Sequence, residues 1–261
     1  MAADSPPYAD LADLVVASPL IIDATIRSAT RIKGAEATNV APGDARFYIE
    51  ADIGVLVRGG GAIPAQVGWL VDVHPDSNGR FPKLKKERVF VFARPVPGAT
   101  GQLQLVAKDA QRRWTPGTDA RVRAIAAEAA SGDAPPVVTG VRSAFHVAGS
   151  LPGEGETQIF LTTKDGRPAA LSIVRRPGET PRWSIALSEL IDDSARTPQV
   201  DTLLWYRLAC FLPASLPDTA TGALEPADAT QAQADYRLVM EQLGPCRGSS
   251  AAPISGGAGP A

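Results

Sequence analysis

Three residues at alternate positions, Asp72, His74 and Asp76, are the first candidates for chemistry in this chain. Alternate side chains of a strand lie on one face, so a carboxylate–imidazole–carboxylate group can form there. Such a group could bind a metal weakly or act as a general base with an orienting acid. A solvated strand end entering the turn 75–79 accounts for the same residues. Because the sequence offers no third convincing ligand and no nearby nucleophile, we expect no metal and no cofactor, and an enzyme with an unrecognised site stays an alternative.

A basic segment directly follows this turn. Between residues 78 and 94 there are six basic side chains and one acid, a local charge of +5. If the segment borders a barrel of the oligonucleotide-binding (OB) type, it could contact phosphates while Phe81 stacks on a base. It could equally meet an acidic protein, or be a solvated loop that keeps a strand edge from pairing with other chains. The candidate binding residues are Arg80, Lys83, Lys85, Lys86 and Arg88.

Other motif tests exclude the common enzyme classes. Gly59-Gly60-Gly61 lacks both the later glycine of a dinucleotide-binding loop and the Lys-Ser/Thr of a P-loop. The chain has no Gly-x-Ser-x-Gly, Ser-x-x-Lys or His-Glu-x-x-His. We interpret His146, late in a predicted strand, as a structural histidine, and the aromatic residues Trp183, Trp205 and Tyr206 as core.

The two cysteines, Cys210 and Cys246, leave two readings open. Their spacing matches no zinc motif. A disulfide between them would fix the C-terminal segment and would persist only in an oxidising compartment. Alternatively, both are free thiols, one of them buried after Trp205-Tyr206 and the other in a loose tail.

Composition limits the class of protein. The 261 residues include 26 basic and 28 acidic side chains, so the formal charge is -2, and a globally basic binder of nucleic acid or membranes is excluded. The chain has no run of eighteen apolar residues, so no membrane-spanning helix is predicted. The first seven residues lack the basic and apolar regions of a signal peptide. The location expected from the chain as written is cytoplasmic, and it is periplasmic if a signal was removed.

Residues 1–133 are predicted to form an OB-like barrel with terminal helices. Period-two patterns, with Gly and Pro between them, predict short strands. In 45–58, for example, Phe47, Ile49 and Ala51 share one face. The predicted strands are 20–32, 45–58, 65–74, 87–93 and 102–107, and the predicted helices are 7–17 and 115–130.

Residues 134–212 are predicted to form an antiparallel β-meander followed by a helix at 201–212. Asp165-Gly166 is a hairpin signal between two apolar runs. Residues 213–261 are predicted to be a linker, a surface helix at 227–243 and a disordered tail from 249. The fold class is therefore α+β, mainly β. The meander strands are predicted at 137–147, 157–163, 169–175 and 182–187.

Residues at both ends of the predicted barrel carry a family resemblance. Ala12-Asp13-Leu14-Val15-Val16 followed by Leu20-Ile21-Ile22-Asp23-Ala24-Thr25-Ile26, and later Lys85-Lys86-Glu87-Arg88-Val89-Phe90-Val91-Phe92 before Trp114, resemble netrin/metalloproteinase-inhibitor-like barrels. The resemblance covers at most residues 9–130 and implies an OB-type barrel, of a group whose members typically bind proteins or are uncharacterised. The chain lacks the cysteines that define the animal members, so no inhibitory function is implied. The whole chain resembles uncharacterised proteins of GC-rich Gram-negative bacteria.

The function expected from the sequence is non-catalytic binding of another macromolecule, most reasonably a protein. The expectation follows because the sequence predicts many strands and helices but no recognisable group of catalytic residues. The alternative is weak binding of single-stranded nucleic acid through residues 80–88. The sequence identifies neither the protein partner nor the oligomeric state.

Overall fold

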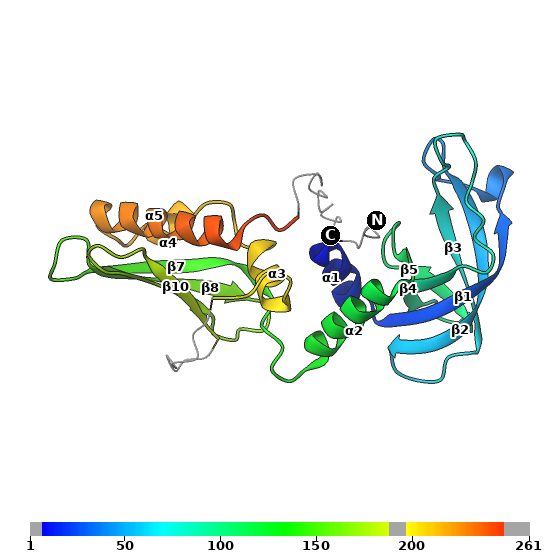
Figure 1. Cartoon of the computed structure of the whole chain (residues 1–261), viewed down its shortest axis with the longest axis horizontal. Helices are drawn as coiled ribbons and strands as arrows, with labels where there is room; N and C mark the ends of the chain where they lie inside the picture. The colour runs from blue at the N-terminus through cyan, green and yellow to red at the C-terminus, as the bar shows by residue number, and fades with distance from the viewer. Residues whose placement is uncertain (1–6, 188–196, 248–261) are drawn as a thin grey trace. The chain divides into compact units, whose positions relative to one another are not determined.

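The computed structural model describes residues 7–187 and 197–247. The described chain divides into two compact units (Figure 1). One unit contains Asp10–Ala130, and the other contains Pro7–Ala9 together with the chain from Ser131 onward. Within the described residues, no helix is both long enough and apolar enough to cross a membrane.

The first unit is built on a closed five-stranded barrel. Its strands are β1 (Leu20–Arg31), β2 (Ala45–Arg58), β3 (Gln66–Val73), β4 (Arg88–Pro95) and β5 (Gln102–Leu105). They follow the order β1-β2-β3-β5-β4, and β4 pairs again with β1, so the wall closes. All pairs are antiparallel except β3–β5. An OB-like barrel was the predicted fold class, and this closed barrel confirms it.

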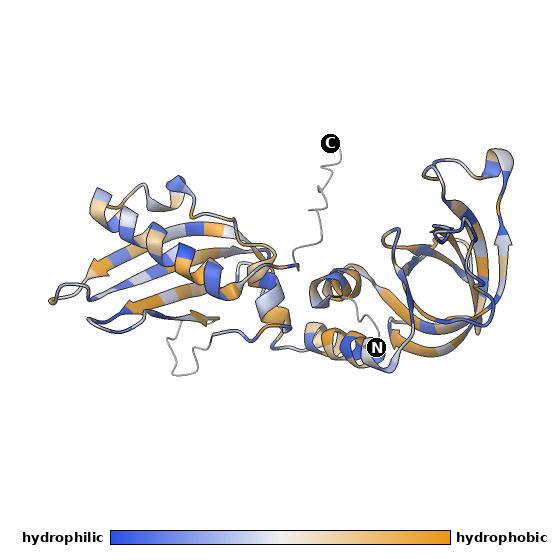
Figure 2. Cartoon of the chain, turned by 45° about the horizontal axis from the view of Figure 1, so that its top comes forward, coloured by the Kyte–Doolittle hydropathy of each residue, from blue (hydrophilic) through white to orange (hydrophobic). Residues whose placement is uncertain are grey.

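The barrel core follows from the period-two pattern. Ile49 and Ala51 of β2 are fully buried, while the intervening Glu50 is exposed. The strands surround a common interior lined by apolar residues (Figure 2). Trp69 of β3 is 1% exposed and its indole N–H donates to Gln111 at 2.9 Å. Gln111 begins β6 (Gln111–Arg113), a short strand on β4 that the sequence did not predict.

Helices flank the barrel strands in the chain. Helix α1 (Tyr8–Ala17) precedes β1, a 3-10 turn η1 (Gly34–Glu36) lies between β1 and β2, and α2 (Pro116–Ala130) follows β6. Thr115 caps α2, because its hydroxyl accepts the backbone N–H of Thr118 at 3.1 Å. Both α-helices were predicted within one residue of their bounds.

The second unit is an antiparallel sheet with helices on one face (Figure 1). Its strands pair in the order β10-β9-β8-β7, as the predicted meander requires. The strands are β7 (Val138–Ala148), β8 (Gly155–Thr163), β9 (Ala170–Arg175) and β10 (Arg182–Ala186). The helices are α3 (Leu203–Ala209), α4 (Asp218–Thr221) and α5 (Pro226–Leu243).

Helix α5 is deeply buried along one side, although the sequence predicts a surface helix there. Tyr236 is 1% exposed and Asp235 is fully buried. The Tyr236 hydroxyl donates to the Pro213 carbonyl at 2.6 Å, and burial raises the pKa of this phenol. The sequence predicts a surface helix, whereas α5 packs on β7 and β8 because a buried polar residue extends its contact face. The predicted disordered tail, from residue 249, lies outside the described residues.

Candidate functional site

The three residues of the predicted acid–histidine group have separate partners. Asp72 accepts two hydrogen bonds from Arg46, at 2.7 and 2.8 Å. His74 donates through Nδ1 to Asp44 at 2.7 Å, and its side chain is 78% exposed. Asp76 accepts the backbone N–H groups of Asn78 and Arg80 and so stabilises the turn. Each acid therefore has a structural partner of its own, and among the described residues no group of three His, Cys, Asp or Glu side chains could hold a metal.

Arg88, from the basic segment, forms an ion pair within the barrel wall. Its guanidinium donates to the Asp23 carboxylate at 2.9 and 2.6 Å, and Asp23 is 1% exposed. The guanidinium also lies 3.8 Å from the centre of the Trp114 ring. The hydrogen bonds to Asp23 raise the pKa of Arg88. A phosphate would have to compete with this buried carboxylate for the same donors.

The rest of the basic segment divides into a packed aromatic and four exposed cations. Phe81 meets Phe47 edge-on at 5.8 Å between ring centroids, and the Arg31 guanidinium lies 4.7 Å from the Phe81 centroid. These contacts occupy the ring that was predicted to stack on a base. The exposed cations are Arg80, Lys83, Lys85 and Lys86.

A gap in the barrel wall is the most distinctive feature of the first unit. Strands β3 and β5 have only two registered pairs in the described structure, Gly68 with Gln102 and Trp69 with Leu103. Beyond these pairs β3 continues to Val73 and β5 to Leu105. A cavity of about 720 Å³ lies here, lined by residues from both strands. The sequence could not reveal this site, because the point at which two strands separate depends on how distant segments pair.

Main-chain groups of both strands face this gap. The N–H of Gly68 donates to Gly101, next to β5, so by alternation along the strand the N–H groups of Leu70 and Asp72 also point toward β5. On β5, the N–H of Val106 donates to Phe92 of β4, so the N–H of Leu105 points toward β3. The gap is therefore bordered by two strand edges, carrying the peptide groups of Asp72 and Leu105.

Among the described residues beside the gap, the one acid is neutralised by an arginine. Arg46 neutralises Asp72, and these hydrogen bonds raise the pKa of the Arg46 guanidinium. Tyr48 and Gln102 are joined by hydrogen bonds, the shorter of them 2.9 Å from the Gln102 amide to the Tyr48 hydroxyl. Leu70 is 49% exposed. Asn39 and the exposed Lys108 also line the cavity. One cation among residues that are mostly apolar or paired is poor chemistry for a phosphate backbone.

The second unit contains a buried polar network under α5. The Thr157 hydroxyl donates to Asp235 at 2.5 Å, so it must accept from Nδ1 of His146 at 2.8 Å. Arg175 also donates to Asp235, at 2.5 Å. The network joins α5 to β7, β8 and β9 and satisfies a fully buried carboxylate. His146 therefore has a structural role, in line with its interpretation from the sequence.

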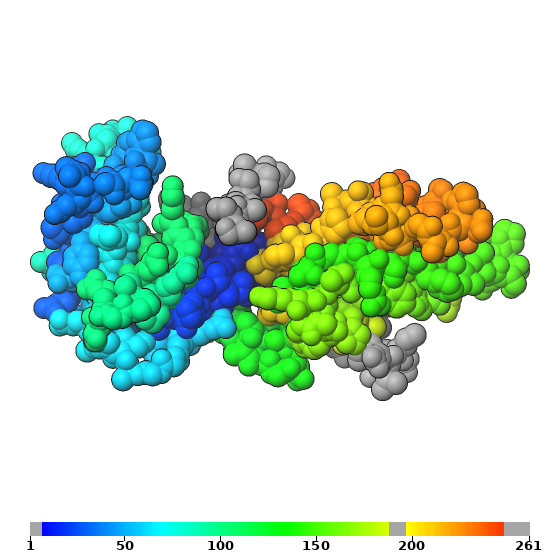
Figure 3. Space-filling view, turned by 180° about the vertical axis from the view of Figure 1, so that it is seen from behind, coloured from blue at the N-terminus to red at the C-terminus, as the bar shows by residue number. Residues whose placement is uncertain are grey.

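On the opposite side of this sheet, residues 7–187 and 197–247 place no helix. Thr157, Ile159 and Leu161 of β8 are buried on the helix side, so Glu156, Gln158 and Phe160 lie on the other. In the space-filling view, strand segments of the second unit reach the surface beside the helices (Figure 3). We call this side the open face; its residues are Phe145, Val147, Glu156, Gln158, Phe160, Ala170, Ser172, Val174, Arg182, Ser184 and Ala186.

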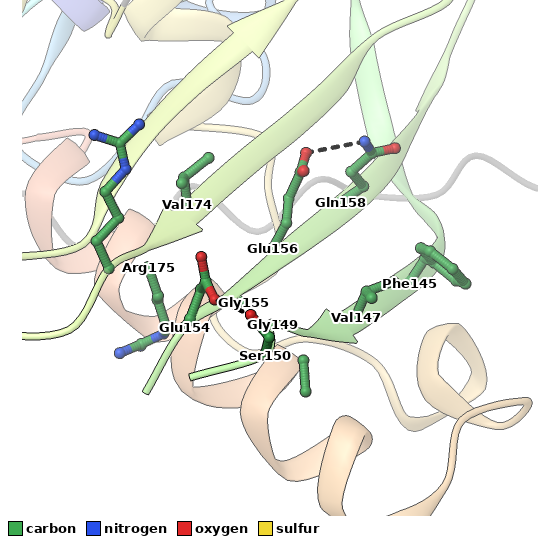
Figure 4. A pocket seen from close by; sticks show the side chains of 12 residues that line it. Phe145, Val147, Gly149, Ser150, Glu154, Gly155, Glu156, Gln158, Val174 and Arg175 are labelled. Atoms are coloured by element: carbon green, nitrogen blue, oxygen red, sulfur yellow. Dashed lines mark hydrogen bonds between the residues drawn. The ribbon is translucent and has the colours of Figure 1, made fainter. Parts of the chain in front are cut away.

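Shallow hollows occupy the open face, and two of them lie beside its aromatic residues. One, of about 580 Å³, is lined by Phe145, Val147 and Val174 among others (Figure 4). The other, of about 570 Å³, has Phe160 beside a floor of small residues, and the Arg142 guanidinium lies 5.7 Å from the Phe160 centroid. Phe145 is 52% and Val147 50% exposed. One sequence feature could have indicated this apolar face: the strand predicted at 137–147 has apolar side chains on both of its sides.

The two cysteines are joined. A disulfide links Cys210, at the end of α3, to Cys246, just beyond α5. It is one of the two alternatives that the sequence left open. The bond closes a loop that contains both α4 and α5.

Comparison with known proteins finds no matching family model, and no curated protein matches the chain.

Proposed function

We propose that this protein is a non-catalytic binding protein whose barrel takes up an extended segment of another protein. The observation that carries the proposal is the gap between β3 and β5. Unpaired N–H and C=O groups at a strand edge are a template for pairing with another extended chain. The resemblance to netrin-like barrels, which typically bind proteins or are uncharacterised, supports the same class of partner.

The chemistry of the gap favours a peptide with small or apolar side chains. Peptide groups of Asp72 and Leu105 supply main-chain partners on opposite borders, so an inserted strand can pair on both sides. Leu70 offers an exposed apolar contact, and Arg46 and Asp72 neutralise each other. Binding should therefore depend weakly on salt, unlike binding to a phosphate backbone.

Peptide selection followed by affinity measurement tests the proposal. A phage-displayed library of random linear peptides is selected on the full chain, and the selected peptides are resynthesised for fluorescence anisotropy. We expect Leu70→Glu to weaken their binding by about tenfold or more, since it places a charge at the gap. Leu56→Glu is the matched control, because Leu56 is 42% exposed on β2 and does not line the cavity.

Amide hydrogen exchange supplies an independent readout. A bound peptide strand should slow exchange at Asp72 and Leu105, whose amides face the gap, and leave Val71 unchanged, whose amide faces β2. If selection gives no binder, or if the binders tolerate Leu70→Glu as well as Leu56→Glu, the proposal is wrong. A single-stranded oligonucleotide tested at about 50 mM salt examines the competing proposal for Arg80, Lys83, Lys85 and Lys86.

The disulfide supports the periplasmic alternative for the location. Structural disulfides persist in oxidising compartments and are rare where thiols are kept reduced. Alkylation of free thiols in freshly lysed host cells tests this, since two labelled cysteines per chain would instead support a reducing compartment.

A further inference from the structure

The open face has a bulky half and a small half. Its cross-strand pairs align Phe145, Gln158, Ser172 and Ser184 in one row across the sheet. The next row contains Phe160, Ala170 and Ala186. Both aromatic side chains therefore stand on β7 and β8, while β9 and β10 present only alanine and serine in these rows. Both rings therefore protrude from one half of the face. The hollow with a floor of small residues extends from Phe160 over the other half, while a second hollow lies beside Phe145 and Val147.

We propose that the open face binds the same face of a second copy of this chain. A half-turn about an axis parallel to the strands places β7 and β8 of one copy over β10 and β9 of the other. Row by row, Phe145 then lies over Ser184 of the second copy, and Phe160 lies over Ala170. Each bulky residue meets a small one, in both directions, because a two-fold interface uses the same contacts twice.

Charge on the open face is compatible with this arrangement. In the row that begins at Val147, Glu156 pairs across the sheet with Val174, and Val174 pairs with Arg182. The same half-turn places Glu156 over Val174 of the second copy, one strand from Arg182, which is exposed and pairs loosely with Glu179 of its own copy at 3.8 Å. The acid of each copy thus approaches a base of the other. Within one copy, Glu156 accepts a hydrogen bond from Gln158 at 3.1 Å (Figure 4) and another from Ser172 at 3.1 Å.

The size of the face sets the expected affinity. Four strands spaced about 4.8 Å apart, with about six residues each at 3.3 Å, give a face of roughly 19 by 20 Å. Two such faces cover roughly 760 Å² together, below the standard size of specific interfaces, so we expect a weak dimer with a dissociation constant no tighter than the micromolar range. The proposal concerns the second unit alone and is independent of peptide binding by the barrel.

Sedimentation velocity on the full, oxidised chain tests the proposal. Between about 1 and 300 μM, a range that brackets a micromolar constant, the wild type should pass from monomer to dimer. Phe145→Ser and Ser184→Phe should each weaken dimerisation by about tenfold or more, one by removing the ring and the other by filling the hollow. Val200→Ser is the control, because Val200 is 64% exposed and outside the open face.

The exchange of the two side chains gives the sharpest test. A double variant, Phe145→Ser with Ser184→Phe, restores a bulky residue opposite a small one and should recover dimerisation. Circular dichroism spectra and melting temperatures check that each variant is folded. A wild type that stays monomeric to 300 μM, or single variants that dimerise like Val200→Ser, would overturn the proposal. A double variant no better than the singles would refute this pairing of rows.

Discussion

The buried carboxylate of Asp23 accepts both of its strong hydrogen bonds from the guanidinium of Arg88. Asp23 lies on β1 and Arg88 on β4, and their backbones are close because Thr25 pairs with Arg88 in the ladder that closes the barrel. Trp114 covers the other side of the guanidinium. Arg88, which the sequence assigns to a candidate binding segment, therefore links the two strands that close the barrel.

Replacing Arg88 should destabilise the barrel. Arg88→Met leaves the buried Asp23 without a cation, and Arg88→Lys retains charge but loses the two-pronged geometry and the ring contact. We expect the melting temperature to fall for both, further for methionine. Lys85→Met, at an exposed position, should stay within about 0.5 kcal/mol of wild type. Equal stability of Arg88→Met and Lys85→Met in urea titrations would contradict the assigned role.

Thr157 should be essential to the network beneath α5. Thr157→Val keeps the shape of the side chain but removes the acceptor of His146 and one donor to the buried Asp235, which keeps its bond from Arg175. We expect the free energy of unfolding of the second unit to fall by about 2 kcal/mol. The control is Thr162→Val on the same strand, where the threonine is exposed. Amide exchange in α5 measures the effect, and similar exchange in both variants would argue against the network.

Gly155 should not tolerate a methyl group. A Cβ there would lie 3.0 Å from both the His146 ring and the Val147 carbonyl. Because the carbonyl belongs to the paired strand β7, it cannot move freely, and Gly155→Ala should cost roughly 1–3 kcal/mol. At Gly140, also in this sheet, nothing lies within 4 Å. Urea titration of Gly140→Ala should therefore show little loss, and equal losses at both glycines would contradict the steric explanation.

Reduction of the disulfide should destabilise the second unit. Loop closure over a sequence separation of 36 predicts a loss of about 4 kcal/mol in the chain-entropy model. Calorimetry with and without reductant measures it. The Cys210→Ser, Cys246→Ser double variant should melt like the reduced wild type and not respond to reductant. A reductant effect on that variant would show that the stability change has another source.

Period-two patterning predicted much of the fold because alternation is a local property. Strand β2 has the predicted bounds, Ala45–Arg58, and the sides assigned to Ile49 and Glu50 are those observed. The turn residues between the strands of the second sheet likewise marked its four strands. Strand β6 was not predicted, because three residues are too few to show a period.

The candidate sites depend on contacts that local patterns do not encode. Asp72 has its partner 26 residues earlier, and Asp235 has partners 60 and 78 residues earlier. Which acid meets which base is decided by register, so neither the Arg46–Asp72 pair beside the β3–β5 gap nor the network under α5 could be predicted. The apolar residues on both sides of β7 were visible in the sequence, but only the placement of the helices shows which side is uncovered.

The link between Cys210 and Cys246 also decides how a mechanical load travels through the second unit. A pull applied beyond Cys246 passes through the sulfur–sulfur bond into the end of α3, so the enclosed segment with α4 and α5 carries no tension. After reduction, the same pull would peel α5 from the sheet first. It would release about 120 Å of chain over the sequence separation of 36, since a fully extended chain spans at most about 3.3–3.6 Å per residue. Oxidation therefore sets the extensibility of this end of the molecule.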